Sequence, residues 1–191
     1  MHYQLIKTFF MQTEYLKYYD LEKYILTDVR ASFKADGHLN TFDFFCIVIW
    51  KANRAKSYLA NRLQKIDSNH DRVVGDLTSK IFVSEDSKEK LRILLENYGF
   101  RLPMASAILS LLYPDDLTIF DVRVCEIFPE YKNLDNLIFK NLWKGYCKYI
   151  ESVRNYGTKQ ISLRDKDRLL WGKSFYDQLQ RDIESNFIRN K

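Results

Sequence analysis

Asp121 is the side chain whose type and position best suit catalysis in this sequence. It begins a short predicted helix over residues 121–128, where the helix dipole favours the charged form of a carboxylate. A carboxylate placed there can stabilise a developing cation or orient a water molecule. The structural alternative is that Asp121 only caps the helix, a role worth about 0.5–2 kcal/mol. Arg123, two residues further on, can bind a phosphate or form a salt bridge.

A second group of polar side chains lies on a predicted helix near the C-terminus. Its members have the spacing i, i+3, i+4 and i+7, which places them on one face of a helix: Arg164, Asp167, Arg168 and Trp171. This face can form the wall of a polar pocket. It can equally form an ion-paired seam that packs the helix onto the core, and both interpretations stay open.

A third candidate group surrounds the end of an apolar run at residues 42–50. Trp50 can stack on a base that has been extruded from a duplex, while Lys51 and Arg54 can reach its phosphates. The structural alternative is that Trp50 belongs to the core and Lys51 marks the end of a helix.

Several kinds of site are excluded. The three histidines have no cysteine or carboxylate at ligand spacing, so we expect no metal: His2, His38 and His70. The three cysteines are too far apart for a disulfide framework or a CxxC zinc site, and they fit a reducing cytosol: Cys46, Cys125 and Cys147. The chain has neither a GxSxG elbow nor a P-loop, which disfavours hydrolases of that type and nucleoside triphosphatases. We therefore expect no cofactor.

The positive charge of the chain is concentrated in two windows. The 191 residues have a formal net charge of +5, which by itself is a weak indication of a nucleic-acid partner. Residues 51–72 hold a net +4 and residues 140–173 a net +6. If the two windows share a face, they form a surface suited to a phosphate backbone. Alternatively, they are solvated helix faces.

Composition and periodicity predict an all-α fold. Only 6 glycines and 3 prolines are present, which favours long helices over the many turns of a sandwich or barrel. Apolar residues recur at helical spacing in about ten segments, with Thr41 and Ser162 as predicted N-caps. The predicted helices cover residues 5–19, 20–33, 42–50, 55–66, 73–82, 88–98, 104–113, 121–128, 134–156, 163–170 and 174–188. We expect a single domain over residues 1–191, built as two closely packed lobes with a cleft between them.

The most specific stretch runs from residue 96 to residue 128. It describes a helix, a turn at Gly99, a helix rich in small residues that Pro103 opens, a short loop, and then Asp121 at the start of a new helix. This order resembles the helix-hairpin-helix region of the endonuclease III-like DNA glycosylase superfamily. The hairpin then covers about residues 88–113 and the catalytic-Asp-like segment residues 117–128. Trp50-Lys51 and the run 163–171 also resemble an uncharacterised bacterial branch of that superfamily.

The resemblance implies roles for individual residues. Asp121 matches the catalytic Asp, and the hairpin positions that face DNA fall on Gly99, Arg101 and Met104. Arg101 stands where the superfamily has a second glycine, and Pro103 stands where bifunctional members have their lysine. Lyase chemistry through a Schiff base is therefore excluded. The cysteines of an iron–sulfur cluster are absent as well.

These inferences combine into one expectation and one alternative. We expect a monofunctional DNA glycosylase-like protein of base excision repair, which binds duplex DNA and hydrolyses an N-glycosidic bond with Asp121 as the key carboxylate. The alternative is a catalytically degenerate helical module that binds nucleic acid or protein. No apolar run is long enough to cross a membrane and the N-terminus does not resemble a signal peptide, so we expect a cytoplasmic protein, favoured as a monomer.

Overall fold

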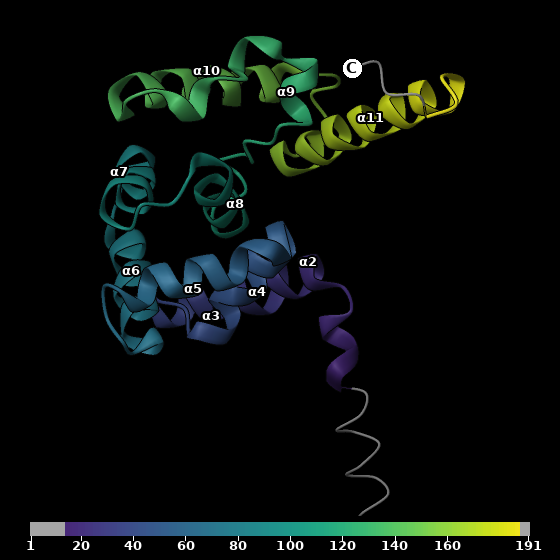
Figure 1. Cartoon of the computed structure of the whole chain (residues 1–191). Helices are drawn as coiled ribbons and strands as arrows, with labels where there is room; N and C mark the ends of the chain where they lie inside the picture. The colour runs from purple at the N-terminus through teal and green to yellow at the C-terminus, as the bar shows by residue number, and fades with distance from the viewer. Residues whose placement is uncertain (1–13, 188–191) are drawn as a thin grey trace, which may run out of the picture. The chain divides into compact units, whose positions relative to one another are not determined.

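The structure is a computed structural model of the chain, and it describes residues 14–187 (Figure 1). These residues form α-helices joined by short 3-10 and π-helical turns, and they contain no β-strand, so the all-α prediction is confirmed. The chain divides into two compact units, Met1–Glu85 and Asp86–Lys191. The expectations of one domain and of a cleft between two lobes stay predictions.

The first unit is organised around α4. Its α-helices are α2 (Leu21–Tyr24), α3 (Arg30–Asp36), α4 (Thr41–Ala52), α5 (Lys56–Gln64) and α6 (His70–Val83). Helix α4 packs against α2, α5 and α6 and buries Phe44, Ile47 and Val48 completely. The hydroxyl of Tyr24 donates a hydrogen bond of 2.8 Å to the buried carboxylate of Asp43, which satisfies both polar groups inside the core.

The second unit is organised around α8. Its α-helices are α7 (Ser87–Arg92), α8 (Leu102–Leu112), α9 (Val124–Ile127), α10 (Phe139–Asn155) and α11 (Leu163–Glu184). A π-helical turn at Ile93–Asn97 continues α7, and α11 packs against both α9 and α10. Alanines and serines let the neighbours of α8 approach its backbone closely, and almost all of the helix is buried.

The extended connector after α8 is held by side chains from two helices. The Ser106 hydroxyl on α8 accepts a hydrogen bond of 2.9 Å from the Phe120 amide. From α10, Tyr146 and Tyr149 donate to the carbonyls of Thr118 and Ile119 at 2.5 and 2.8 Å. The connector therefore reaches residue 121 along a defined path rather than as a loose loop.

Several helix boundaries differ from the sequence prediction, and the predicted helix over residues 121–128 is only the short α9, which begins at Val124, after Asp121. Asn40, not Thr41, is the N-cap of α4, because its side chain accepts from the Asp43 amide at 2.8 Å. Helix α10 begins at Phe139, since a separate 3-10 turn at Leu134–Asn136 precedes it. The two predicted C-terminal helices form one helix, α11, which continues through Gly172. Most of the predicted helix over residues 5–19 lies outside the described residues.

Candidate nucleic-acid interface

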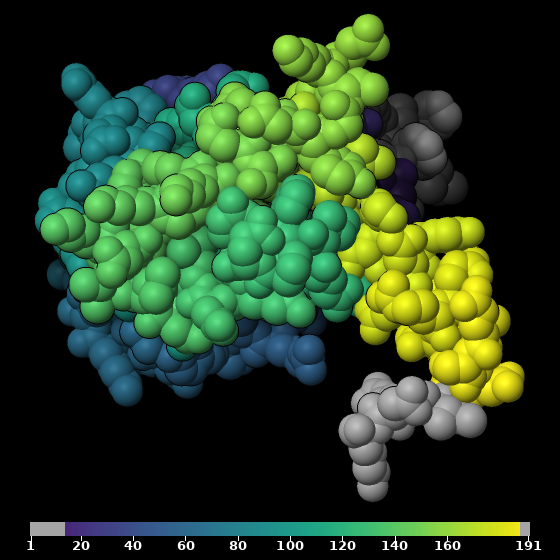
Figure 2. Space-filling view, turned by 90° about the horizontal axis from the view of Figure 1, so that it is seen from above, coloured from purple at the N-terminus to yellow at the C-terminus, as the bar shows by residue number. Residues whose placement is uncertain are grey.

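Three exposed lysines form a row along α10. Lys140, Lys144 and Lys148 are spaced i, i+4 and i+8, so they lie on one side of the helix at steps of about 6 Å. The opposite side of α10 is buried in the second unit, through Leu142, Tyr146, Tyr149, Ile150 and Val153. We call the three lysines the α10 lysine stripe. Figure 2 shows α10, in green, on the face of the molecule that is turned toward the viewer.

The other basic residues of the positive window 140–173 mostly have partners. Three of them form ion pairs along their own helices, Arg154 with Glu151 at 3.6 Å, Arg168 with Asp165 at 2.6 Å and Lys173 with Asp177 at 2.6 Å. Two more are buried: Arg164, which pairs with Asp167, and Lys166, which donates to the carbonyl of Arg154. By contrast, the lysine stripe forms no ion pair with any residue between 14 and 187. Most of the exposed basic side chains of this window that form no ion pair with a described residue therefore lie on α10.

A groove adjoins the first lysine of the stripe. It has a volume of about 600 Å³ and lies between α7 and the start of α10, with these lining residues: Asp86, Lys88, Glu89, Arg92, Glu96, Ile138, Phe139 and Lys140. Three acidic and three basic side chains line it. The groove is thus close to neutral, and it does not by itself select an anion.

Asp121 lies in the turn that leads into α9. Its carboxylate accepts a hydrogen bond of 2.9 Å from the Arg123 amide, and its carbonyl accepts one of 3.0 Å from the Cys125 amide. This is the geometry of an Asp that caps a turn. Burial, and then the nearby Asp121 carboxylate, raise the pKa of the Cys125 thiol to about 11.

The structure brings Arg123 and Trp171 together, two predicted site residues that are far apart in the sequence. The guanidinium of Arg123 lies 5.2 Å from the ring centre of Trp171 and 5.6 Å from that of Phe175. It also donates a 2.7 Å hydrogen bond to the side chain of Gln178. The rings of Trp171 and Phe175 are stacked with centres 5.7 Å apart, and each residue is 44% exposed. Phe175 and Gln178 are not among the predicted site residues, although both continue the helical spacing that begins at Trp171.

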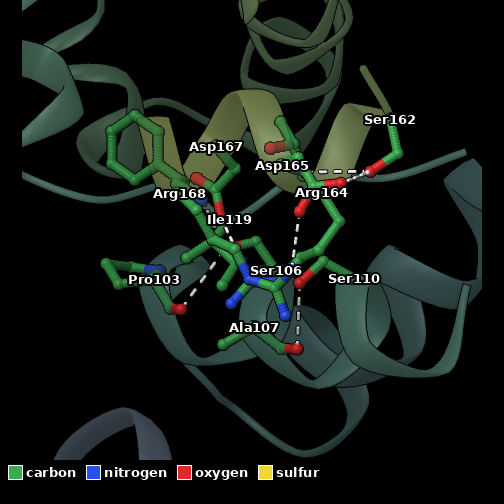
Figure 3. A network of polar contacts seen from close by, with 12 residues as sticks. Pro103, Ser106, Ala107, Ser110, Ile119, Ser162, Arg164, Asp165, Asp167 and Arg168 are labelled. Atoms are coloured by element: carbon green, nitrogen blue, oxygen red, sulfur yellow. Dashed lines mark hydrogen bonds and ion pairs between the residues drawn. The ribbon is translucent and has the colours of Figure 1, made fainter. Parts of the chain in front are cut away.

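Figure 3 draws the other predicted site residues of α11, Arg164, Asp167 and Arg168, which differ in burial. Arg164 and Asp167 are buried and ion-paired. Burial, with the Asp167 carboxylate as a second cause, raises the pKa of Tyr146 and of Tyr149. Arg168 instead pairs with Asp165 at the surface. The four residues predicted to share a face are thus divided between the core and the surface.

The predicted hairpin positions lie in the turn before α8 and in its first turn. Gly99 adopts a left-handed conformation with φ of 66°, which ends the preceding helix. The Arg101 side chain contacts the carboxylate of Asp135, with its Nε at 2.7 Å, and Asp135 also accepts from the Leu102 amide at 2.8 Å. Met104 is buried. Asp135 is not among the predicted site residues, because it lies more than thirty positions along the chain from its partners.

Trp50, Lys51 and Arg54 belong to the first unit, whereas the other predicted site residues belong to the second. Trp50 and Lys51 are half-buried in the last turn of α4, and Arg54 is exposed in the following 3-10 turn. Their roles at DNA stay predictions.

Residues 14–187 hold no group of His, Cys, Asp or Glu side chains arranged to bind a metal ion. Within the same limits, no helix is both long enough and apolar enough to cross a membrane.

Comparison with known proteins identifies relatives of a different kind from those expected. The chain is 27% identical, over 160 residues, to the regulatory protein RecX of Streptococcus pneumoniae strain ATCC 700669 / Spain 23F-1, and equally to that of strain R6. The match covers 77% of this chain and 61% of each relative, so the chain spans about three fifths of their length. No protein-family model matches the chain. No solved structure matches it either.

These relatives correct the sequence analysis. They are named regulatory proteins, so the resemblance to the helix-hairpin-helix DNA glycosylases is wrong, and with it the predicted hydrolysis of N-glycosidic bonds and the place in base excision repair. The residues that suggested the resemblance have structural roles: Gly99 ends a helix, the small residues of α8 allow close packing, and Asp121 caps a turn. A glycine turn followed by a helix of small residues is a general solution for packing two helices.

Proposed function

We propose that this chain is a regulatory protein that acts by binding duplex DNA, and that the α10 lysine stripe is its main contact with the phosphate backbone. The single observation that carries this proposal is the row of three exposed lysines on α10 without an ion-pair partner among the described residues. The relatives named regulatory proteins favour a function by binding over a function by chemistry.

Electrostatics favours a phosphate backbone as the ligand of the stripe. A duplex carries one negative charge for about every 1.7 Å of its axis, and a protein that neutralises phosphates gains affinity by releasing counterions. Three like charges in a row suit a linear array of phosphates better than they suit a single small anion. Such contacts position a protein on DNA without reading its sequence.

The anchoring of α10 makes this contact pre-organised. Tyr146 and Tyr149, on the buried side of the helix, donate to the carbonyls of Thr118 and Ile119. Because the helix is fixed, the lysines lose only side-chain freedom when they bind. A lower ordering cost leaves more of the electrostatic gain as affinity.

Salt-dependent DNA binding tests the proposal. The affinity of the full chain for a short fluorescent duplex is measured by anisotropy at several salt concentrations. The triple variant Lys140→Gln, Lys144→Gln and Lys148→Gln is expected to bind more weakly. The slope of log K against log salt is negative, and for this variant its magnitude is expected to be smaller by roughly 3, at about 0.9 for each lost phosphate contact.

A matched control separates the stripe from general charge. The triple variant Lys23→Gln, Lys34→Gln and Lys132→Gln removes the same charge from exposed lysines elsewhere. We expect it to keep a slope close to that of the unmodified chain. Equal losses in the two triple variants, or an unchanged slope in the stripe variant, would contradict the proposal.

A further inference from the structure

Helix α11 exposes a continuous apolar seam on the side that faces away from its own unit. Its core-facing side is marked by Leu163, Leu170 and Ser174, which are buried. On the other side, five positions follow one another at alternating spacings of three and four residues: Leu169, Gly172, Tyr176, Leu179 and Ile183. The four large side chains among them are between 39% and 62% exposed. We call these five residues the α11 seam.

This spacing is that of a coiled-coil interface. Apolar residues at alternating steps of three and four form the narrow stripe along which two helices pack. The seam extends over about 21 Å, at 1.5 Å per residue. In Figure 1 the C-terminal half of α11 continues past α9, and Figure 2 shows the same yellow segment standing clear of α9 and α10.

Gly172 opens a notch in the middle of the seam. A Cβ atom built at this position meets nothing within 4 Å, so no described neighbour requires a glycine there. Glycine is also a poor helix former, and it stands near the middle of a 22-residue helix. A position that costs helix stability and leaves open space is suited to a large side chain from another helix.

The charges that border the seam select an antiparallel copy of the same helix. In an antiparallel pair about a two-fold axis, Tyr176 of one copy covers Gly172 of the other, and Leu169 meets Leu179. The same register places Arg168, which also pairs with Asp165 of its own helix at 2.6 Å, opposite Asp182, twice by symmetry. Lys173 lies near the axis, but Asp177 of its own helix pairs with it at 2.6 Å.

A parallel pair fits the same residues less well. It would place Gly172 opposite Gly172 and leave the notch empty. It would also bring Arg168 close to Lys173 of the second copy, because flanking positions five residues apart meet in parallel coiled coils. The fit of Tyr176 over Gly172 therefore favours the antiparallel arrangement, and the approach of Arg168 to Asp182 adds to it.

We propose that the α11 seam is a self-association surface through which two copies of this chain pair, with their α11 helices antiparallel. The proposal goes beyond DNA binding and uses none of the lysines of the stripe. It also replaces the monomer favoured by the sequence analysis.

Sedimentation velocity of the full chain over a range of concentrations tests the proposal. The unmodified chain is expected to shift from monomer to dimer mass as its concentration rises. Leu179→Glu is expected to raise the dissociation constant roughly a hundredfold, because each dimer loses two leucine contacts worth about tenfold each. Arg181→Glu, an exposed change outside the seam, is the matched control and is expected to leave the dissociation constant unchanged.

A charge exchange tests the predicted register. Arg168→Asp places two carboxylates opposite each other and is expected to weaken the dimer several-fold. Adding Asp182→Arg restores opposite charges and is expected to recover most of the loss. A dimer that the exchange does not restore would contradict the antiparallel register.

Two other outcomes would overturn the proposal. One is a chain that stays monomeric at every concentration. If Leu179→Glu then lowers the melting temperature of that monomer, another part of the chain covers the seam. The other is a dimer that tolerates Leu179→Glu, which would place the interface elsewhere. Circular dichroism of each variant verifies that its helix content is unchanged.

Discussion

Arg164 and Asp167 show how a pair of charges can stabilise a core instead of forming a binding site. Both residues are less than a tenth exposed, so each has lost most of its contact with water. Two isolated charges at such positions would be costly, and their pairing offsets that cost. Arg168 and Asp165 form a pair at the same i, i+3 spacing in the same helix but at the surface. The two pairs differ mainly in burial, which makes them a natural comparison.

The comparison yields a prediction about stability. Arg164→Met removes the ion-pair partner of a buried carboxylate and is expected to lower the free energy of unfolding by about 3–5 kcal/mol. Arg168→Met, the same substitution at the surface, is expected to cost less than about 1 kcal/mol. Urea unfolding followed by circular dichroism measures both. Similar losses in the two variants would show that burial of the first pair contributes little.

The buried thiol of Cys125 predicts a loss of stability in alkaline solution. Burial raises its pKa from 9.0 to about 11 in the folded chain, so between these values the unfolded chain releases a proton that the folded chain retains. The free energy of unfolding therefore falls as pH rises from 9 to 11, by up to about 1.4 kcal/mol per pH unit. Below pH 9 both states hold the proton and the effect is absent.

The variant Cys125→Ala isolates this contribution. It lacks the titrating thiol, so its stability is expected to decline less steeply than that of the unmodified chain over the same pH range. Denaturant unfolding at a series of pH values gives the difference between the two proteins. A constant difference from pH 9 to pH 11 would rule out Cys125 as the source.

At the scale of elements, two glycines have opposite effects on their helices. Gly99 has φ of 66°, a conformation that costs other residues about 1–2 kcal/mol. Gly172 is helical with open space around its Cα, and alanine is a better helix former by about 1 kcal/mol. Gly99→Ala is therefore expected to destabilise the chain, whereas Gly172→Ala is expected to stabilise it.

Thermal or urea unfolding in dilute solution measures both signs. The concentration must be low because the proposed pairing through α11 would otherwise add to the stability of the unmodified chain. If Gly172→Ala destabilised the dilute chain, a neighbour would have to contact this position. The same measurement thus tests whether the α11 seam is open in the monomer.

At the scale of the whole molecule, net charge and local charge make different predictions for DNA binding. The formal net charge is +5 at pH 7, and the pI is about 9.0, so at pH 9 the chain as a whole is close to neutral. Lysine side chains ordinarily keep their proton at pH 9, since they titrate near 10.4. If the α10 lysine stripe is the main contact, DNA affinity at constant ionic strength is expected to change by less than about twofold between pH 7 and pH 9.

Anisotropy titrations at these two pH values measure the effect, with the salt concentration held constant. A loss of tenfold or more at pH 9 would indicate that the overall field of the protein, and not the stripe, determines binding. Circular dichroism at both pH values shows whether the fold is unchanged. This experiment is independent of the substitutions on α10.

The sequence by itself determined the fold class and much of the helix pattern. Few glycines and prolines and a repeated helical spacing predicted an all-α chain, and the structure confirms it. Ser162 caps α11 and Pro103 opens α8, as their positions predict. These features depend on neighbours within a few residues, so a linear sequence contains them.

Only the tertiary structure decided which polar residues are available to a partner. Arg164 and Lys148 are both basic residues of the same positive window. Arg164 is buried in an ion pair, whereas Lys148 is exposed. The sequence predicts Asp121 at the start of a helix, as a catalytic carboxylate would be, but in the structure α9 begins at Val124 and the Asp121 carboxylate accepts a hydrogen bond from the Arg123 amide in the preceding turn. Burial and partners depend on residues far away in the chain, such as Asp135 beside Arg101. Periodicity predicts which residues share a helix face, but it does not show whether that face meets the core, the solvent or another molecule.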